Sequence, residues 1–272
     1  MALTTVALLP HSPLLIPEIG RANYSFLAKT VAAYEEIKND LKAGSVDTII
    51  IISPHSASQV DSFVLNVAPE MEINLKDFGF IPPKTVLSGD AFLADQIKNA
   101  LRPEFPLQLI SENALDYGSA IPLYLLKDAC PEAKIIIISP ADNASLDSQW
   151  RFGERLKTVL MSNEKNIALI ASGDLSHRLK KKSPGGYSPK GAKFDNKLIE
   201  YLSDLTTASA NILKMDAKLV KDAGECGLRP LLILLGIISG SKWQPEILSY
   251  QTDFGIGYLT VNFKLWTPSQ IS

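Results

Sequence analysis

The stretch Ile49–Ser56 reads IIIISPHS, and it indicates how the chain folds. Four consecutive isoleucines are typical of a strand buried on both faces, as in a largely parallel sheet covered by helices. Pro54 then prevents the chain from continuing as a regular helix. It is followed by His55, one of only three histidines in 272 residues. We therefore expect His55 to lie just past the carboxyl end of a central strand.

The same stretch has an internal copy. IIIISPHSAS at 49–58 recurs as IIIISPADNAS at 135–145, where Ala141 takes the place of His55. We expect both copies to be strands with similar exits. Because only one exit has an imidazole, the turn itself does not require histidine. Isoleucine-rich strands followed by Ser-Pro are also common, so a chance similarity is the alternative.

Segments with strand and helix patterns alternate along the chain. Strand patterns occur at 4–9, 47–52, 134–139, 167–172, 245–252 and 257–263, and helical spacing occurs at 23–44, 89–101, 145–161, 193–205, 216–224 and 227–240. This alternation indicates an α/β fold. No linker-like segment divides residues 1–272, so we expect a single α/β domain with a central, mostly parallel mixed β-sheet flanked by helices.

The composition excludes several classes of protein. A net charge of −2 provides no electrostatic footprint for nucleic acid or an anionic membrane. The longest apolar run, at 231–240, is too short for a membrane span of about 20 residues. The N-terminus lacks a basic region and contains Pro10 and Pro13, so we expect no signal peptide. With only Cys130 and Cys226, we expect a reducing compartment and a cytoplasmic location.

Each of the three histidines follows an apolar strand pattern. His11 follows VALLP, His55 follows IIIISP, and His177 follows IALIASGDLS. Ligands bind outside the carboxyl ends of strands in open α/β sheets, and parallel strands bring all three imidazoles to one edge. A lone histidine is usually a surface or core residue, but three at strand exits favour a shared site. The segment KKKSPGGYSPKG at 180–191 is expected to be a loop beside this site, its lysines facing either solvent or an acidic substrate.

Imidazole is suited to zinc, copper, iron and nickel, and two kinds of metal site are compatible with these residues. In the first, three histidines bind zinc and leave a position for water, as in hydrolytic enzymes. In the second, two histidines and a carboxylate bind Fe(II), and the third histidine acts as an acid/base. The candidate carboxylates are Asp174, Glu225 and Asp253. Glu225 lies in the segment Gly224–Gly227, where it is either a ligand or an acid that favours the start of a helix.

Five motifs in order resemble those of class III extradiol ring-cleavage dioxygenases. They are PHSPLLIPEIG (10–20), ISPHS (52–56), LDYGSAIPLYLL (115–126), ASGDLSHRL (171–179) and AGECGLRPLLILLG (223–236). More narrowly, the chain is similar to the bacterial and archaeal LigB-like proteins that are related to the Memo family. The resemblance extends from His11 to about Tyr258, which is almost the whole chain.

This resemblance implies a function and a set of site residues. The chain would be a non-haem Fe(II)-dependent extradiol dioxygenase that acts on a catechol-type dihydroxyaromatic with O₂. The iron ligands of the family match His11, His55 and Glu225, and the family's acid/base matches His177. The implied fold is LigB-like. Because relatives often associate as dimers, a homodimer is a further expectation.

Two positions depart from the family pattern. Asp116-Tyr117-Gly118 stands where these dioxygenases often have Asp-His-Gly, so we expect Tyr117 to replace a catalytic histidine in part. Memo-like proteins have a cysteine that matches Cys226 rather than Glu225, and a thiolate favours copper or zinc. The alternatives are therefore a Memo-like metal-binding protein without dioxygenase activity, or a metal-dependent hydrolase using the same site. The sequence does not determine the substrate or the native metal.

Overall fold

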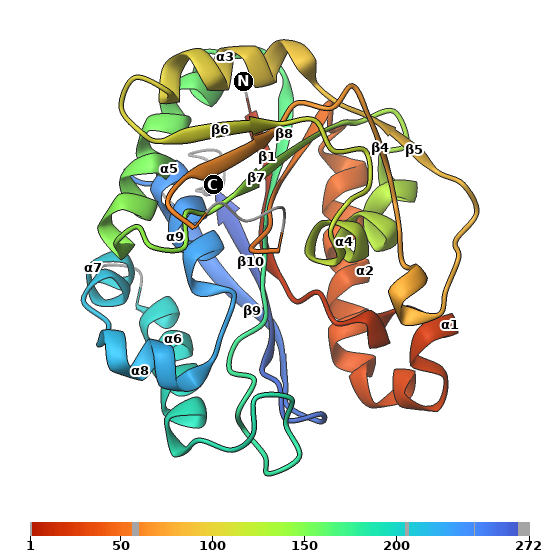
Figure 1. The fold of residues 1–272 in the computed structure, drawn as a ribbon, viewed down its shortest axis with the longest axis vertical. Coiled ribbons are helices and arrows are strands. Elements are labelled where there is room, and N and C mark those ends of the chain that lie inside the picture. The colour runs from red at the N-terminus through yellow and green to blue at the C-terminus, as the bar shows by residue number, and fades with distance from the viewer. Residues whose placement is uncertain (1, 56–59, 205–206, 242, 266–272) are drawn as a thin grey trace, which may run out of the picture.

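The isoleucine-rich strands lie at the centre of one mixed sheet. A computed structural model of the protein describes residues 2–55, 60–204, 207–241 and 243–265. In these residues an eight-stranded sheet has the order β6-β3-β7-β2-β8-β1-β10-β9, and β4 and β5 form a separate pair (Figure 1). The strands are β1 (Ala2–Leu9), β2 (Thr48–Ile52), β3 (Phe63–Asn66), β4 (Glu70–Glu72), β5 (Val86–Ser88), β6 (Leu107–Ile110), β7 (Lys134–Ser139), β8 (Asn166–Ser172), β9 (Trp243–Gln251) and β10 (Tyr258–Leu265).

The four central strands β7, β2, β8 and β1 are parallel, as the sequence predicts. Antiparallel pairing begins outside this group, where β3 pairs with β7 and β10 pairs with β1. The two copies of the isoleucine stretch are the neighbouring strands β2 and β7, with Ile49 opposite Ile135 and Ile52 opposite Ile138. They therefore occupy neighbouring positions in the sheet, but β2 ends at Ile52 whereas β7 continues through Ser139. Positions 56–58 of the first copy lie outside the described residues.

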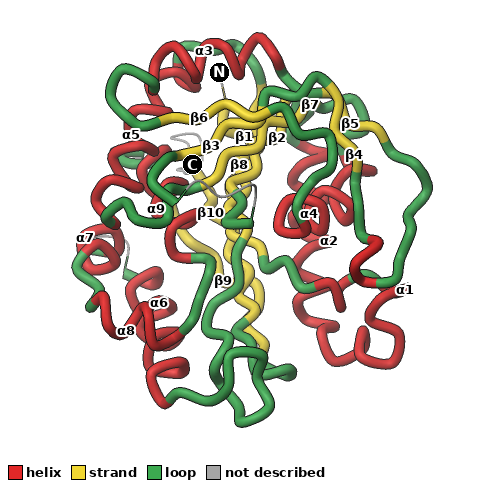
Figure 2. The backbone as a smooth tube through the Cα atoms, in the orientation of Figure 1, coloured by secondary structure: helices red, strands yellow, loops and turns green. Residues whose placement is uncertain are grey.

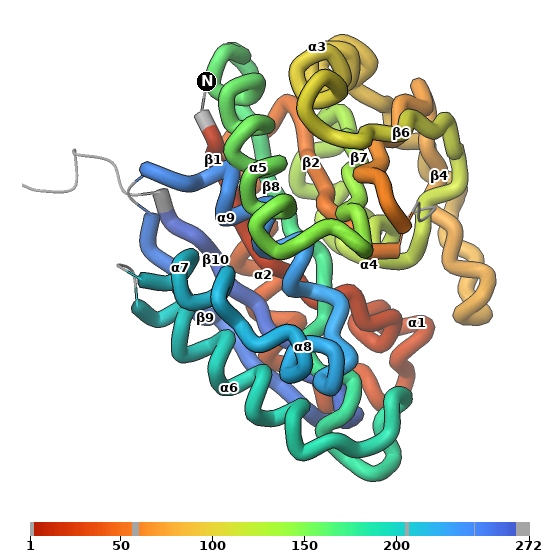
Figure 3. Tube along the Cα trace, turned by 60° about the vertical axis from the view of Figure 1, so that its left-hand side comes forward, coloured from red at the N-terminus to blue at the C-terminus, as the bar shows by residue number. Residues whose placement is uncertain are grey.

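Helices cover both faces of the sheet, as Figures 2 and 3 show. They are α1 (Pro17–Gly20), α2 (Ala28–Ala43), α3 (Ala91–Leu101), α4 (Tyr117–Leu126), α5 (Leu146–Met161), α6 (Pro189–Ser203), α7 (Ala208–Leu213), α8 (Ala217–Ala223) and α9 (Leu228–Ile237), with 3₁₀ turns at Pro13–Leu15, Arg21–Leu27, Lys76–Phe78 and Lys127–Ala129. The core residues of α2 and α4 pack on one face, and those of α3, α5, α6 and α9 pack on the other. Within the described ranges, no helix has the length and apolar character needed to cross a bilayer.

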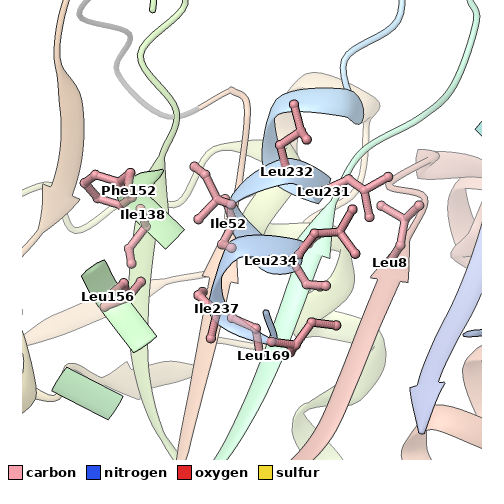
Figure 4. Packing of buried hydrophobic residues seen from close by; sticks show 14 of the residues in the cluster. Leu8, Ile52, Ile138, Phe152, Leu156, Leu169, Leu231, Leu232, Leu234 and Ile237 are labelled. Atoms are coloured by element: carbon pink, nitrogen blue, oxygen red, sulfur yellow. The ribbon is translucent and has the colours of Figure 1, made fainter. Parts of the chain in front are cut away.

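Alternate isoleucines of β2 face the two layers. Ile50 and Ile52 join the cluster that contains α9, whereas Ile49 and Ile51 join the cluster that contains α2 and α4. Figure 4 shows side chains of α9 packed over Ile52 and its neighbours in the sheet. Burial on both faces explains why the strand is uniformly apolar instead of alternating.

The helix expected at 23–44 differs at its start, because the α-helix begins only at Ala28 and is preceded by a 3₁₀ segment. Gln251 of β9 decides this boundary. Its side-chain oxygen accepts hydrogen bonds from Thr30 N at 2.8 Å and from Thr30 Oγ1 at 2.9 Å, and its nitrogen donates to Phe26 O. A cap supplied by a strand more than 200 residues away is not visible in local sequence.

The other expected elements are present with small shifts in their ends. The helix expected at 193–205 is α6, which begins earlier, at Pro189, where Ser188 caps it; residue 205 lies outside the described part of the chain. The short strands β3, β4, β5 and β6 and the helices α1, α4 and α7 were not predicted as elements. Most of these elements are short, and such segments have little periodicity to reveal them.

Candidate metal centre and acid–base site

Three side chains that can bind a metal meet at the carboxyl edge of the parallel strands. His11 follows β1, His55 follows β2, and Cys226 lies just before α9. His11 Nε2 is 3.2 Å from His55 Nε2 and 3.6 Å from Cys226 Sγ. All three ligand atoms lie within 4.8 Å of one another, and no other such group occurs among the described residues.

The two spacings from His11 Nε2 to the other donor atoms fit a single ion. A tetrahedral ion with bonds of about 2.05 Å to nitrogen and about 2.3 Å to sulfur separates two nitrogens by about 3.3 Å. It separates a nitrogen from a sulfur by about 3.6 Å. The observed distances from His11 Nε2, 3.2 Å to His55 Nε2 and 3.6 Å to Cys226 Sγ, are close to these values. Two imidazoles and a thiol are also a donor set that transition metals accept.

The tautomer of His11 is determined by Ser172, the last residue of β8. Ser172 Oγ donates its proton to Gly118 O at 2.5 Å, so it accepts the hydrogen bond from His11 Nδ1 at 2.9 Å. Nδ1 therefore bears the proton, and Nε2 presents a lone pair to the cluster. Burial, together with the charges of His55 and His177, lowers the pKa of His11 well below its usual value. A neutral imidazole is the form that binds a metal.

We predict that Ser172→Ala weakens metal binding by about 10- to 100-fold, because His11 loses the acceptor that holds its tautomer and ring orientation. Ser139→Ala is the matched control. Ser139 is a buried serine at the end of β7, and its hydroxyl has no hydrogen-bond partner, so its loss leaves metal affinity unchanged. Competition with a chromogenic chelator measures both affinities. Equal affinity of Ser172→Ala and the unmodified protein would contradict this role.

His55 is positioned by a serine and an aspartate. Its backbone N–H donates to Ser53 Oγ at 3.3 Å, and Ser53 Oγ donates to Asp116 Oδ1 at 2.6 Å. Asp116 also caps α4 by accepting from Ser119 N. A Cβ atom at Gly118 would lie 2.6 Å from Ser53 Oγ and 3.1 Å from His55 Cδ2, so only glycine fits there. These contacts explain Asp116 and Gly118 on either side of Tyr117.

Tyr117 lies against the metal-facing side of His55. Its ring stacks on the imidazole with centroids 4.4 Å apart, and its hydroxyl is 2.8 Å from His55 Nε2. That nitrogen is the same one that faces His11. A metal held by His55 Nε2 would take the place of this hydrogen bond. Burial raises the pKa of Tyr117, so the hydroxyl keeps its proton at neutral pH.

Glu225 and its neighbour Cys226 face different surroundings. Glu225 Oε2 accepts a hydrogen bond of 2.7 Å from Leu228 N, the first residue of α9. Burial raises the pKa of Glu225 to about 7. Cys226 Sγ instead lies by His11 and accepts from Asp174 N at 3.3 Å. Glu225 as a metal ligand stays a prediction, and the residue that the structure places next to the two histidines is Cys226.

The third histidine lies outside this cluster of three ligands and has a free nitrogen. His177 Nδ1 is 2.8 Å from Gly224 O, and because a carbonyl only accepts, Nδ1 has the proton and Nε2 the lone pair. His177 Nε2 is 3.9 Å from Asp174 Oδ2, which is 3.8 Å from His11 Nε2. Burial lowers the pKa of His177 and raises that of Asp174 to about 7. Asp253, the last candidate carboxylate, is exposed on the turn between β9 and β10.

The segment that holds His177 is anchored by Asp195, which the sequence did not single out. Asp195 Oδ1 accepts from Ser176 N at 2.9 Å, and Oδ2 accepts from Tyr250 OH at 2.7 Å. A Cβ atom at Gly257 would lie 2.2 Å from Asp195 Oδ2, so this residue must be glycine. The only sequence signal is an acidic residue on the apolar side of a helix, and such a signal is weak.

Asp195 makes stability depend on pH. Burial raises its pKa from 3.8 to about 6, so the folded protein binds this proton more tightly than the unfolded chain does. Its contribution to the free energy of unfolding is complete below pH 3.8 and is lost as pH rises through about 6. The loss amounts to roughly 3 kcal/mol. In urea unfolding between pH 4 and 7, Asp195→Asn should show a shallower fall in stability with pH. Parallel curves for the two proteins would refute the prediction.

A pocket of about 470 Å³ opens beside the cluster. His11, Tyr117, Asp174 and His177 line it together with apolar side chains. The loop expected at 180–191 borders it through Pro184 and leads into α6. This volume is within the range of small-molecule sites. Two of the three histidines, His11 and His177, thus line one pocket, and His55 contacts His11 and Tyr117 at its edge.

Comparison with known proteins identifies the family. Residues 5–261 match the family described as the catalytic LigB subunit of aromatic ring-opening dioxygenase. The chain belongs to the LigB family. The match covers nearly the whole chain, and the parallel centre of the sheet and the flanking helices are consistent with a LigB-like fold.

Three known proteins are similar to this chain. Protein CA_C1420 of Clostridium acetobutylicum is 34% identical over 268 residues; the match covers 95% of this chain and 57% of that protein, so the chain spans little more than half its length. The 3,4-dihydroxyphenylacetate 2,3-dioxygenase of Escherichia coli is 23% identical over 271 residues, which are 93% of this chain and 96% of that enzyme. The crystal structure of the Escherichia coli K12 protein JW3007 matches with a TM-score of 0.65 at 18% identity, covering 95% and 99% of the two chains, and shows the fold alone.

Proposed function

We propose that the protein is a metal-dependent ring-opening dioxygenase that acts on a catechol-type dihydroxyaromatic with O₂. The observation that carries this proposal is the meeting of two imidazoles and a thiol at the edge of a partly aromatic pocket that His11 and His177 both line. Membership of the LigB family supports the ring-opening chemistry. The distant Escherichia coli relative, named for 3,4-dihydroxyphenylacetate, supports a diol substrate.

In this proposal His11, His55 and Cys226 hold one metal ion, and Fe(II) is the metal that we propose for ring opening. When bound, the metal supplies the redox chemistry that joins the diol to O₂. The protein positions the side chains that would hold the metal. Asp174 O accepts from the backbone N–H groups of Cys226 and Gly227, which places the thiol opposite His11.

His177 is the proposed acid/base. Its Nδ1 proton is held by Gly224 O, so Nε2 can accept a phenolic proton from a diol in the pocket and return it later. Burial lowers the pKa of His177, which keeps the ring neutral and able to act as a base at neutral pH. The Tyr117 hydroxyl, which is beside His55 Nε2, can donate a hydrogen bond to a substrate oxygen.

A second candidate rests on Cys226. A thiolate is a soft ligand that favours Zn(II) or Cu(I), and the family's histidine is replaced by Tyr117. Both features favour a Memo-like metal-binding protein without ring-opening activity. A hydrolase that uses zinc at the same three ligands is the remaining alternative. The LigB family alone does not choose among these activities.

One set of assays separates the candidates. The protein is purified without oxygen, its metal content is measured, and samples are loaded with Fe(II), Zn(II) or Cu(I). The dioxygenase proposal expects O₂ uptake and a coloured ring-opened product from a catechol panel with Fe(II) alone. Absence of turnover on every diol, with iron demonstrably bound, would reject it. Activity on ester or amide substrates with Zn(II) in the absence of O₂ would favour the hydrolase.

A further inference from the structure

Apolar side chains form much of the pocket wall beyond the histidines, beside the hydroxyl-bearing residues Ser12 and Tyr258. Leu14, Phe78, Phe254 and Ile256 line it. They come from three segments. Leu14 lies after β1, Phe78 lies in the 3₁₀ turn before β5, and Phe254 and Ile256 lie in the β9–β10 turn. Phe78 packs edge-on against Tyr117, with ring centroids 5.8 Å apart. A ligand in this pocket therefore has its ring beside aromatic and aliphatic side chains.

The pocket wall beyond the histidines contains an acidic residue but no basic one among the described residues. Asp174 is the acidic residue that lines the pocket, and among the described residues no lysine or arginine lines it. The nearby lysines do not change this. Lys180 Nζ donates to Asp253 O at 2.8 Å, which directs it to the β9–β10 turn. Lys181 and Lys182 are exposed. Of the two alternatives for these lysines, the one in which they face an acidic substrate lacks structural support.

The loop that carries these lysines is attached to the β9–β10 turn, which also contributes Phe254 and Ile256 to the pocket. Ser183 Oγ donates to Gly255 O at 2.8 Å and accepts from Lys180 N, and Leu179 N donates to Gly255 O. These bonds hold the loop against the β9–β10 turn. Bringing Lys180 into the pocket would require its Nζ to leave Asp253.

These walls favour uncharged substituents on the ring of a ligand. A carboxylate placed against Phe78 or Ile256 loses water without gaining a cation, which is unfavourable. An alkyl substituent in the same place gains the free energy of burying apolar surface. The same pocket therefore separates neutral diols from acidic ones.

We propose that the site accepts dihydroxyaromatics with an uncharged, apolar ring substituent and discriminates against those with a carboxylate. This proposal rests on the proposed function for its assumption that the ligand is a diol. It distinguishes this chain from the Escherichia coli relative, whose name specifies an acidic diol. Leu14, Phe78, Phe254 and Ile256 are the residues that determine specificity.

Binding is measured without turnover. The protein is loaded with Zn(II), and calorimetry compares 4-ethylcatechol with 3,4-dihydroxyphenylacetate, which differ by a methyl group in place of a carboxylate. We expect 4-ethylcatechol to bind at least about tenfold more tightly. Phenylacetate, which has no diol, measures any direct binding of a carboxylate to the metal, and we expect none.

The second part of the binding experiment introduces a positive charge into the pocket wall. Ile256→Arg should strengthen binding of 3,4-dihydroxyphenylacetate about tenfold and weaken that of 4-ethylcatechol. Leu14→Arg is a second variant in case the first does not fold. Phe92→Arg is the control, because Phe92 is 68% exposed and does not line the pocket. It should leave both affinities unchanged.

The outcomes distinguish this proposal from the function on which it rests. If 3,4-dihydroxyphenylacetate binds the unmodified protein as tightly as 4-ethylcatechol, the selectivity proposal fails and the diol site stands. If neither diol binds to protein that demonstrably holds Zn(II), the diol function itself fails. Tighter binding of 4-ethylcatechol, reversed by Ile256→Arg and unaffected by Phe92→Arg, supports both.

Discussion

Replacing Cys226 by alanine is expected to weaken metal binding by more than about 100-fold, whereas Glu225→Gln is expected to leave it unchanged. Loss of groups that only support a ligand costs about 10- to 100-fold, so loss of a ligand costs more. Cys226 Sγ is 3.6 Å from His11 Nε2. The Glu225 carboxylate is bonded to Leu228 N, and a glutamine oxygen can accept the same hydrogen bond.

The two adjacent variants form a matched pair, because both lie at the start of α9. Metal affinity is measured by chelator competition. Substitution with Co(II) adds a spectroscopic test, since a bound thiolate produces a charge-transfer absorption that Cys226→Ala lacks and Glu225→Gln keeps. The reverse pattern, with metal lost in Glu225→Gln and retained in Cys226→Ala, would restore Glu225 as the third ligand.

Replacing His177 by alanine is expected to lower the rate of ring opening by about 10²- to 10⁴-fold while the metal content stays the same. The loss follows from removing the Nε2 lone pair that takes the phenolic proton. His177 is outside the group formed by His11, His55 and Cys226, so its removal leaves the three ligands in place. Product absorbance on the diol panel measures the rate.

Lys180→Ala is the control for this variant. Lys180 lies three residues from His177 on the same loop, and its Nζ bonds to Asp253 O, so its loss tests for a general disturbance of the loop. We expect Lys180→Ala to retain full activity. Loss of metal from His177→Ala would contradict the acid/base role and would indicate the alternative in which all three histidines bind the ion.

Local sequence patterns were sufficient to predict the parallel strands and the sheet edge at which the site lies. Four consecutive isoleucines predicted a strand buried on both faces, and β2 is such a strand. Parallel strands place their carboxyl ends at one edge of a sheet, so histidines after β1, β2 and β8 were expected to share that edge. His11 and His55 are there in direct contact, and His177 lines the same pocket.

Other features depended on contacts between distant segments. Ser172 and Asp116 hold the two histidines through hydrogen bonds that cross between strands and helices, and nothing in their local sequence indicates this role. Asp195 reaches Ser176 and Tyr250 from α6 in the same way. Such partners are set by how helices pack on the sheet, which a single sequence does not specify.

Residue type and order are sufficient to predict that this chain folds around parallel isoleucine strands with histidines at their exits, because burial on both faces and strand polarity follow directly from them. Which of the adjacent residues Glu225 and Cys226 meets the histidines depends instead on how α9 packs against the site. The backbone N–H groups at the start of α9 need an acceptor, and Glu225 provides it. Its carboxylate is thereby turned to the helix, and the thiol of Cys226 faces His11.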